Sequence, residues 1–275
     1  MNTSTILSIQ NAHLRDENIQ FTELGHKYTI LSDPSSTYTS VTTWNHTHFP
    51  KFDADKIIKK MMKGKGFKEG HKYWGLTAEQ IKEQWSSNTA AQAGTDLHYE
   101  IECFMNNALV PSHYTHEDLY AQYILLNPLF TDTTAIEWQY FIQFIHDHPH
   151  LKPYRTEWVI YDEKYKLAGS IDMVYENPDG SLSIYDWKRC KQISRINQYN
   201  QYAITSAICH FPDANFWHYA LQLNTYKSII ERNYGKIVKE LVLVRLHPET
   251  EEKTYELITL PNLNKELMDL LSEKE

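Results

Sequence analysis

Two aspartates and a lysine on a predicted β-hairpin are the residues of this chain best suited to chemistry. Residues 168–188 hold two strand-like runs around a Pro-Asp-Gly turn, in which proline presets φ and glycine adopts the positive φ that ends the turn. A five-residue loop over 177–181 makes paired residue numbers sum to 358 and places Asp172 opposite Asp186, on the face that carries Lys188. A sum of 356 leaves the aspartates on a diagonal, and an odd sum separates them onto opposite faces. Because like charges this close repel, we expect a divalent metal ion between them, with Lys188 beside it.

The alternative is a surface hairpin on which Asp186 and Lys188 only pair with each other, since exposed ion pairs are common and contribute little. Leu182 and Ile184 lie on the same face, so the charges stand at the end of an otherwise apolar stripe. Charged groups that enter a core need a partner or a function. We therefore expect a site rather than a surface ion pair.

The length and composition indicate one enlarged α/β domain. The 275 residues contain no Pro/Gly/Ser-rich linker, and we expect a helical N-terminal elaboration over 1–93 with a small β element, followed by a core over 94–275. No apolar run approaches a membrane span and residues 1–10 do not resemble a signal peptide, so we expect a soluble, intracellular protein. The 3 cysteines are far apart, which excludes a disulfide framework, a zinc knuckle and an iron-sulfur cluster.

The charge is unevenly distributed along the chain. The formal net charge is −8, yet residues 51–72 hold eight lysines against three acidic residues, a local balance of +5 that leaves −13 elsewhere. A basic strip on an acidic body directs a polyanion such as DNA to one place. The lysines expected to bind substrate are Lys56, Lys60, Lys63 and Lys65. The alternative for these lysines is a solvated helix face, and nearby aromatic residues either stack on unpaired bases or pack in the core.

Hydrophobic periodicity and turn residues predict the remaining elements. The expected helices cover 53–63, a segment starting at Thr77, one starting at Thr89, 117–126, 134–146, 197–207, 215–233 and 261–271. The expected strands cover 19–22, 26–30, 154–161, the two arms of the hairpin, 239–246 and 254–259. Residues 38–44 are expected to be extended or to enter a helix. From Gly94 on, this order predicts a mixed sheet with helices on its faces.

Four short motifs, in this order, resemble the PD-(D/E)XK nuclease superfamily and within it the RecB-like exonuclease branch, which has mitochondrial, viral and phage members. They are Gly94 to His98 (G-T-x-x-H), Gly169 to Asp172 (G-x-x-D), Asp186 to Lys188 (D-x-K) and Gln222 to Tyr226 (Q-x-x-x-Y). The proline of the superfamily name is Ile171 here, and the cysteines that hold an iron-sulfur cluster in some relatives are missing. The resemblance covers about 38–260 and implies a restriction-endonuclease-like core, a mixed central β-sheet flanked by helices.

The resemblance also suggests roles for individual residues. It implies that His98 and the carbonyl of Trp187 join Asp172 and Asp186 in holding one or two Mg²⁺ or Mn²⁺ ions, and an imidazole ligand favours Mn²⁺ somewhat. The alternative for His98 is a structural helix histidine. Glu102 is expected beside His98 as a supporting residue.

Four further side chains have expected roles around the metal. Lys188 would hold the attacking water or the charge on the phosphate, and only a lowered pKa would make it a base. Glu157 would bind metal through water or orient Lys188, unless it is a surface residue of an edge strand. Gln222 and Tyr226 would orient the phosphate or a strand, unless they form an ordinary polar helix face.

These expectations together predict a metal-dependent DNA exonuclease acting on single-stranded or end-processed DNA in replication, recombination or repair. The nearest alternative is a structure-selective endonuclease of the same fold. A DNA-binding module without catalysis is disfavoured by the intact Asp172, Asp186 and Lys188. A hydrolase of small phosphate esters is disfavoured because the basic strip exceeds the needs of a small substrate. No membrane partner is expected, and the oligomeric state stays open with a monomer as the expectation.

Overall fold

A six-stranded mixed sheet forms the centre of the fold. The computed structural model describes residues 5–86, 89–107, 114–127 and 135–274. The sheet consists of β3 (Thr39–Ser40), β4 (Lys152–Asp162), β5 (Leu167–Glu176), β6 (Leu182–Lys188), β7 (Val238–Arg245) and β8 (Glu256–Thr259). Strand β5 is antiparallel to both β4 and β6, β6 runs parallel to β7, and β8 is antiparallel to β7. The predicted α/β class with a mixed sheet is confirmed.

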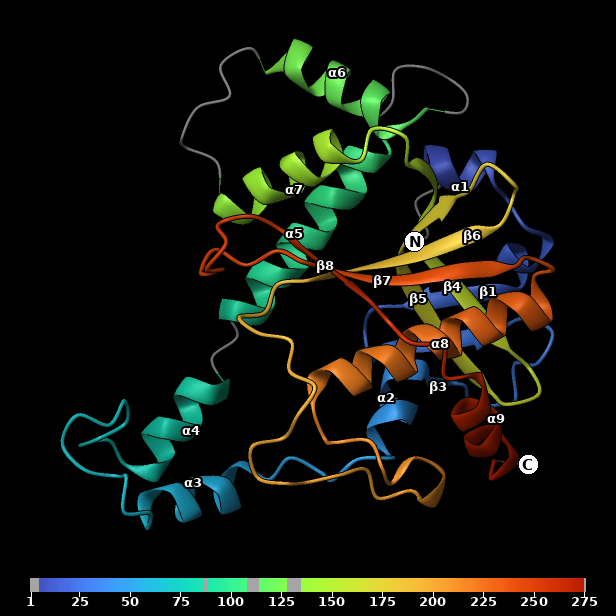
Figure 1. The fold of residues 1–275 in the computed structure, drawn as a ribbon. Coiled ribbons are helices and arrows are strands. Elements are labelled where there is room, and N and C mark those ends of the chain that lie inside the picture. The colour runs from blue at the N-terminus through green and yellow to red at the C-terminus, as the bar shows by residue number, and fades with distance from the viewer. Residues whose placement is uncertain (1–4, 87–88, 108–113, 128–134, 275) are drawn as a thin grey trace.

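Helices cover both faces of this sheet (Figure 1). The first face packs against α2 (Val41–His46), α8 (Asn215–Asn233) and α9 (Asn264–Ser272), and we call its core cluster the α8 cluster. The opposite face packs against α1 (Ile6–Gln10), α5 (Thr89–Met105), α6 (His116–Leu126) and α7 (Ile136–Asp147), and we call its core the α5 cluster. Because both faces of the sheet are covered, β6 is buried along almost its whole length, polar residues included.

Two smaller units stand beside the sheet. A two-stranded ribbon of β1 (Ile19–Thr22) and β2 (Lys27–Ile30) follows a 3₁₀ turn over Leu14–Asn18 and packs on Tyr161 and Ala168. Helices α3 (Ala54–Met62) and α4 (Ala78–Ser86) contact each other and lie apart from the sheet (Figure 1). The division at residue 94 stays a prediction, while β3 shows that the N-terminal part contributes a strand to the central sheet.

The register of the hairpin is the one that the turn chemistry predicts. Met173 pairs with Tyr185 and Glu176 with Leu182, so paired numbers sum to 358. Gly180 takes φ 79°, and the amide of Asn177 donates to the Ser181 carbonyl at 2.8 Å. Extended by one pair, this register sets Asp172 opposite Asp186.

Successive side chains along β4 and β5 point to alternate faces of the sheet, and this alternation is interrupted at one residue with an unusual backbone conformation. Glu157 has φ 42°, a left-handed conformation that is uncommon for a residue with a side chain. Before it, the Thr156 hydroxyl accepts a hydrogen bond from the side chain of Asn106, the residue directly after α5, and after it Trp158 packs in the α8 cluster. The paired residues of β5 change in the same way, since Met173 belongs to the α5 cluster and Ile171 to the α8 cluster. Backbone strain of this kind is concentrated at functional positions. Here it lies at Glu157 of β4, next to β5, the strand that carries Asp172.

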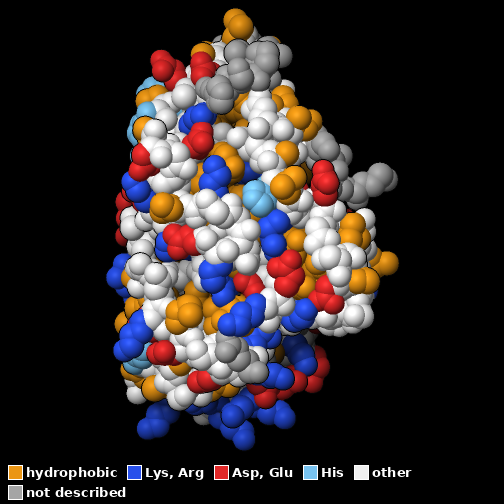
Figure 2. Space-filling view, turned by 90° about the vertical axis from the view of Figure 1, so that its right-hand side faces the viewer, with side chains coloured by type: hydrophobic (Ala, Val, Ile, Leu, Met, Phe, Trp, Pro, Cys, Tyr) orange, Lys and Arg blue, Asp and Glu red, His pale blue; other side chains and the backbone are white. Residues whose placement is uncertain are grey.

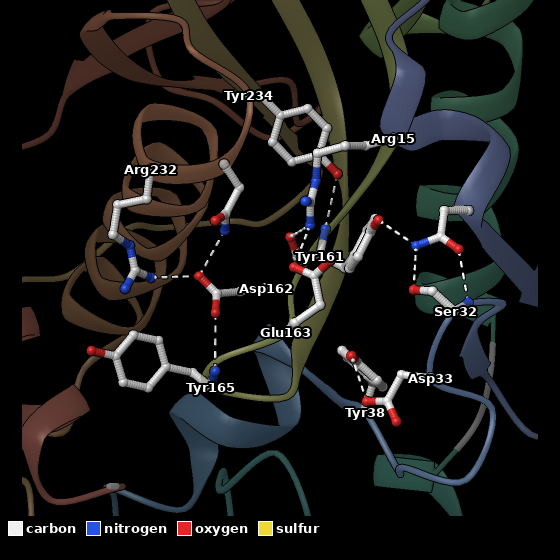
Figure 3. Close-up of polar contacts among 12 residues, drawn as sticks. Arg15, Ser32, Asp33, Tyr38, Tyr161, Asp162, Glu163, Tyr165, Arg232 and Tyr234 are labelled. Carbon is white, nitrogen blue, oxygen red and sulfur yellow. Dashed lines mark hydrogen bonds and ion pairs between the residues drawn. The ribbon is translucent and has the colours of Figure 1, made fainter.

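The turn between β4 and β5 is joined to the end of α8 through Asp162 (Figure 3). The buried Asp162 carboxylate accepts a hydrogen bond from the Tyr165 amide at 2.9 Å and one from Asn233 at 2.8 Å, and it pairs with Arg232 at 2.9 Å. Charge-assisted bonds of this kind hold a helix end in a defined place. They hold α8, which carries Gln222 and Tyr226, against β4 and β5, which carry Glu157 and Asp172.

Most predicted elements are found, and one helix prediction is wrong. The capping box at Thr77 is present, because its amide donates to Gln80 and its hydroxyl accepts from the Gln80 amide. The predicted start at Thr134 and the capping role of the Thr89 side chain lie outside what the structure describes. Residues 197–207 form bends, a β-bridge and the start of a 3₁₀ turn rather than a helix. The cause is local: the Asn197 side chain accepts from two following amides and so competes with helical hydrogen bonds.

Candidate metal centre

His98 reaches the hairpin from α5. Its neighbours Leu97 and Ile101 are buried in the α5 cluster, which turns the half-buried imidazole toward β5 and β6. His98 Nε2 lies 3.0 Å from the Trp187 carbonyl oxygen, and Nδ1 lies 3.5 Å from Asp172 Oδ2. A carbonyl oxygen only accepts, so Nε2 carries a proton, and Nδ1 is the ring nitrogen that faces the Asp172 carboxylate. A cation between these two atoms would stabilise the arrangement.

Glu157 completes a group of three half-buried side chains with His98 and Asp172. One ligand atom from each residue lies within 4.8 Å of the other two. An ion held at about 2.1 Å by each ligand keeps any two ligand atoms within about 4.2 Å, so side-chain shifts of a few tenths of an ångström let the group fit. Nitrogen and carboxylate donors suit Mg²⁺, Mn²⁺ or Zn²⁺ in general, and the identity of the ion is not decided by the donors alone.

The Glu157 carboxyl is held in an environment that disfavours its charge. Burial and the Asp172 carboxylate raise the pKa of Glu157 to about 8, against the opposing effect of a hydrogen bond from Ser170 Oγ at 2.9 Å. Tyr28 of β2 packs on the same strand face, and burial together with the Glu157 charge raises the pKa of Tyr28 to about 12. The small N-terminal ribbon therefore lies against the glutamate end of the site, which periodicity in the sequence does not reveal.

This raised pKa gives a testable dependence of stability on pH. Glu157 binds its proton more tightly in the folded chain, so its stabilising contribution is complete below about pH 4.5 and is lost as pH rises through about 8. In a metal-free buffer, the unfolding free energy of wild type should fall relative to that of Glu157→Gln between pH 5 and 9, by on the order of 1 to 3 kcal/mol. Urea unfolding at several pH values measures the difference. Added Mn²⁺ should restore stability at pH 8.5 in wild type and not in the variant, and parallel pH curves would contradict this assignment.

The buried Asp186 and the half-buried Lys188 form a separate ion pair beside the three-residue group. Lys188 Nζ lies 2.5 Å from Asp186 Oδ2 and 4.7 Å from the ring centre of Tyr219 on α8. Burial and the neighbouring Asp172 raise the pKa of Asp186 to about 6, although Lys188 opposes the rise. Burial lowers the pKa of Lys188, but the carboxylates of Asp186 and Asp172 outweigh it and leave that pKa raised. Lys188 is therefore an ammonium ion here, which suits charge stabilisation rather than proton abstraction.

The α8 residues lie on the other side of the aspartates. Gln222 Nε2 donates to the Tyr226 hydroxyl at 3.0 Å and lies 3.2 Å from Thr42 Oγ1 of α2. Tyr226 is buried, and Asp172 and Asp186 contribute to the rise of its pKa after burial itself. Tyr219 was missed by motif reasoning, although its spacing of three and seven residues from Gln222 and Tyr226 places all three on one helix face.

Gly169 leaves room for Tyr226. A Cβ atom at position 169 would lie 2.7 Å from Tyr226 Cε1 and 3.1 Å from its hydroxyl oxygen. We expect Gly169→Ala to displace the ring and to lower the unfolding free energy by about 1 to 3 kcal/mol, because overpacking forces such shifts. Urea unfolding of this variant, of Tyr226→Val and of the double variant tests the contact. The second substitution should remove most of the penalty of the first, whereas additive penalties would place the clash elsewhere.

Two other predicted groups are not joined to the metal group by direct contacts. Among the described residues, the Glu102 carboxylate accepts no hydrogen bond from His98, but its charge contributes to the raised pKa of Glu157. The four lysines predicted to bind substrate are exposed on α3 and the turn after it. Figure 1 places α3 away from the hairpin, so these lysines lie outside the metal group.

Comparison with known proteins finds a distant structural likeness. No protein-family model matches the chain, and no curated protein matches it. The fold is similar to the crystal structure of a "putative exonuclease" from Eubacterium rectale, with a TM-score of 0.41 and 14% sequence identity, over 86% of this chain and 77% of that one. At this distance the likeness does not assign a function. None of the helices in the described residues has the length and apolar character needed to cross a membrane.

Proposed function

We propose that this protein is a metal-dependent nuclease that hydrolyses phosphodiester bonds in DNA, and specifically an exonuclease. The observation that carries the proposal is the convergence of His98, Glu157 and Asp172 within 4.8 Å beside the buried Asp186 and Lys188 pair. Structural ion pairs rarely place three carboxylates and an imidazole in one half-buried region, because their mutual repulsion costs stability. A bound cation offsets that cost and gives the arrangement a use.

The residues divide the work of hydrolysis among them. His98, Glu157 and Asp172 would hold Mg²⁺ or Mn²⁺. Asp186 would be available to a second ion if Lys188 moved away from it. A bound ion would lower the pKa of its water and polarise the phosphate. The Lys188 ammonium would stabilise the negative charge that develops on the phosphate. Gln222 of α8 donates a hydrogen bond to the Tyr226 hydroxyl, and these two side chains together would orient the phosphate. The Trp187 carbonyl accepts from His98 here, so it would join the ion only if the ring turned.

DNA is the proposed substrate because of the charge distribution. The lysines of residues 51–72 give +5 to one segment of a chain that is otherwise −13, which favours a polyanion at α3 and repels it elsewhere. An exonuclease is favoured over an endonuclease because the lysine-rich helix α3 stands apart from the sheet, where it could receive a strand end approaching the metal group (Figure 1).

Digestion of matched DNA forms tests this function. Linear, nicked and closed circular forms of one plasmid are incubated with Mg²⁺ or Mn²⁺, and oligonucleotides labelled at the 5′ or 3′ end report polarity and strand preference. We expect shortening of linear DNA and intact closed circles. Efficient cutting of closed circles would indicate an endonuclease instead, and DNA binding without any cleavage would indicate a binding module.

A further inference from the structure

The connection between β6 and α8 exposes apolar side chains on a segment directly after the candidate site. The connection begins one residue after Lys188, and its residues 194–204 include Ile196, Tyr199 and Ile204. Their exposed fractions are 70%, 71% and 65%. Single exposed apolar residues need no explanation, but three within nine positions form a surface that a binding partner would cover.

These side chains are exposed on a braced backbone rather than a loose one. The Asn197 side chain accepts hydrogen bonds from the amides of Tyr199 at 2.8 Å and Gln201 at 3.3 Å, and donates to the Asp213 carbonyl at 2.6 Å. The Ile204 amide donates to a carbonyl of the α2 end at 2.8 Å. These bonds involve only backbone groups and the Asn197 side chain. The backbone that carries Tyr199 is therefore held in place independently of any contact that the Tyr199 ring makes.

Positive charge lies next to this apolar surface. Lys60 Nζ of α3 lies 5.7 Å from the ring centre of Tyr199, so the segment and the helix meet there. The neighbouring Lys56, Lys59 and Lys63 are exposed on the same helix. Figure 2 shows Lys and Arg side chains gathered at the lower end of the molecule, the end at which α3 lies in Figure 1. An exposed aromatic ring therefore lies beside a lysine of α3, on the segment that follows Lys188 in the chain.

We propose that residues 194–204 and the lysine face of α3 form one surface that binds unpaired nucleotides, with Tyr199 stacking on a base and Lys60 binding a phosphate. This rests on the proposed function, and it names single-stranded DNA as the form that reaches the site. Lysines alone bind duplex and single strand alike, whereas an exposed ring adds affinity only where bases offer their faces. An anionic membrane surface would also suit lysines with apolar side chains. The continuity of the segment with Lys188 favours a nucleic acid.

Fluorescence anisotropy in EDTA tests this surface without cleavage. The full chain is titrated into labelled 20-nucleotide oligothymidylate, a labelled 20-base-pair blunt duplex and vesicles containing anionic lipid. Tyr199→Ala should weaken binding to the single strand by about 5-fold to 100-fold, the usual range for loss of one stacked base. Tyr199→Phe keeps the ring and should bind within about twofold of wild type. Lys60→Ala should weaken binding and lower its salt dependence, whereas Lys265→Ala, which removes an exposed lysine from α9, should do neither.

The outcomes separate this inference from the proposed function. Three results would overturn the inference, even for an active nuclease. They are equal binding of the single strand by wild type and Tyr199→Ala, tighter binding of the duplex than of the single strand, and binding of vesicles alone. Tyr199-dependent binding of the single strand by a chain that cleaves no DNA with Mg²⁺ or Mn²⁺ would support this surface and contradict the proposed hydrolysis. Because the ring is 71% exposed, the variants should keep the thermal stability of wild type.

Discussion

Replacing Asp172 by Asn should abolish DNA cleavage while making the metal-free protein more stable. Asp172 contributes to the raised pKa values of both Glu157 and Asp186, so its charge opposes theirs in the folded chain. Asparagine keeps the shape and an oxygen that can accept from the Trp187 amide, now bonded at 3.1 Å, and it removes the repulsion. We expect a gain of about 0.5 to 2 kcal/mol in the free energy of unfolding in EDTA, because removing strained functional groups commonly stabilises a protein.

The loss of activity follows from the loss of a metal ligand. A bound ion contributes several kcal/mol of transition-state stabilisation, so cleavage should fall by about a thousandfold or more. Isothermal titration with Mn²⁺, urea unfolding in EDTA and a cleavage assay measure the three effects. Asp179→Asn is the matched control, since Asp179 accepts from Ser181 and pairs with Lys239 at the hairpin turn, and its loss should destabilise without affecting metal binding. A destabilised Asp172→Asn protein that still binds Mn²⁺ would show that Asp172 is only structural.

Replacing Lys188 by Ala should abolish cleavage and leave the affinity for DNA largely intact. Lys188 lies inside the site, between the Asp186 carboxylate and the Tyr219 ring, and its side chain is only 18% exposed, so we expect it to contribute little to the initial binding of DNA. Loss of one preorganised charge that faces the transition state costs roughly a hundredfold to a thousandfold in rate. Cleavage under single-turnover conditions and anisotropy with labelled DNA in EDTA separate the rate from the affinity.

Three companion variants make the role of Lys188 specific. Lys239→Ala removes an exposed lysine from β7, 54% exposed, and should leave both measurements unchanged. Tyr219→Phe keeps an aromatic ring over the ammonium and should retain activity, whereas Tyr219→Leu should lose part of it because a cation over a ring is stabilised by roughly 0.5 to 2 kcal/mol. Cleavage by Lys188→Ala at the wild-type rate would refute the assignment of Lys188.

Local chemistry made several features predictable. The Pro-Asp-Gly turn decides the pairing over a few residues, so the register that opposes Asp172 and Asp186 could be predicted before any tertiary contact was known. Helix periodicity and caps likewise placed α3 and α8, and Gly235 ends α8 with φ 64° as a C-cap glycine does. The one wrong helix, over 197–207, failed because a side chain, Asn197, bonds the backbone locally and no periodic pattern records that.

The sequence by itself determined the strand pair, its register and the set of residues with suitable chemistry, because turns, alternation and side-chain type act within a few residues. Only the tertiary structure decided which of them meet. Glu157 rather than Asp186 joins His98 and Asp172. The left-handed backbone conformation of Glu157 changes the face of the sheet to which β4 side chains point, and Asp186 is paired with Lys188 instead. Tyr28 and Tyr219 come to the site from elements far apart in the chain, and packing of whole faces, not local spacing, brings them there.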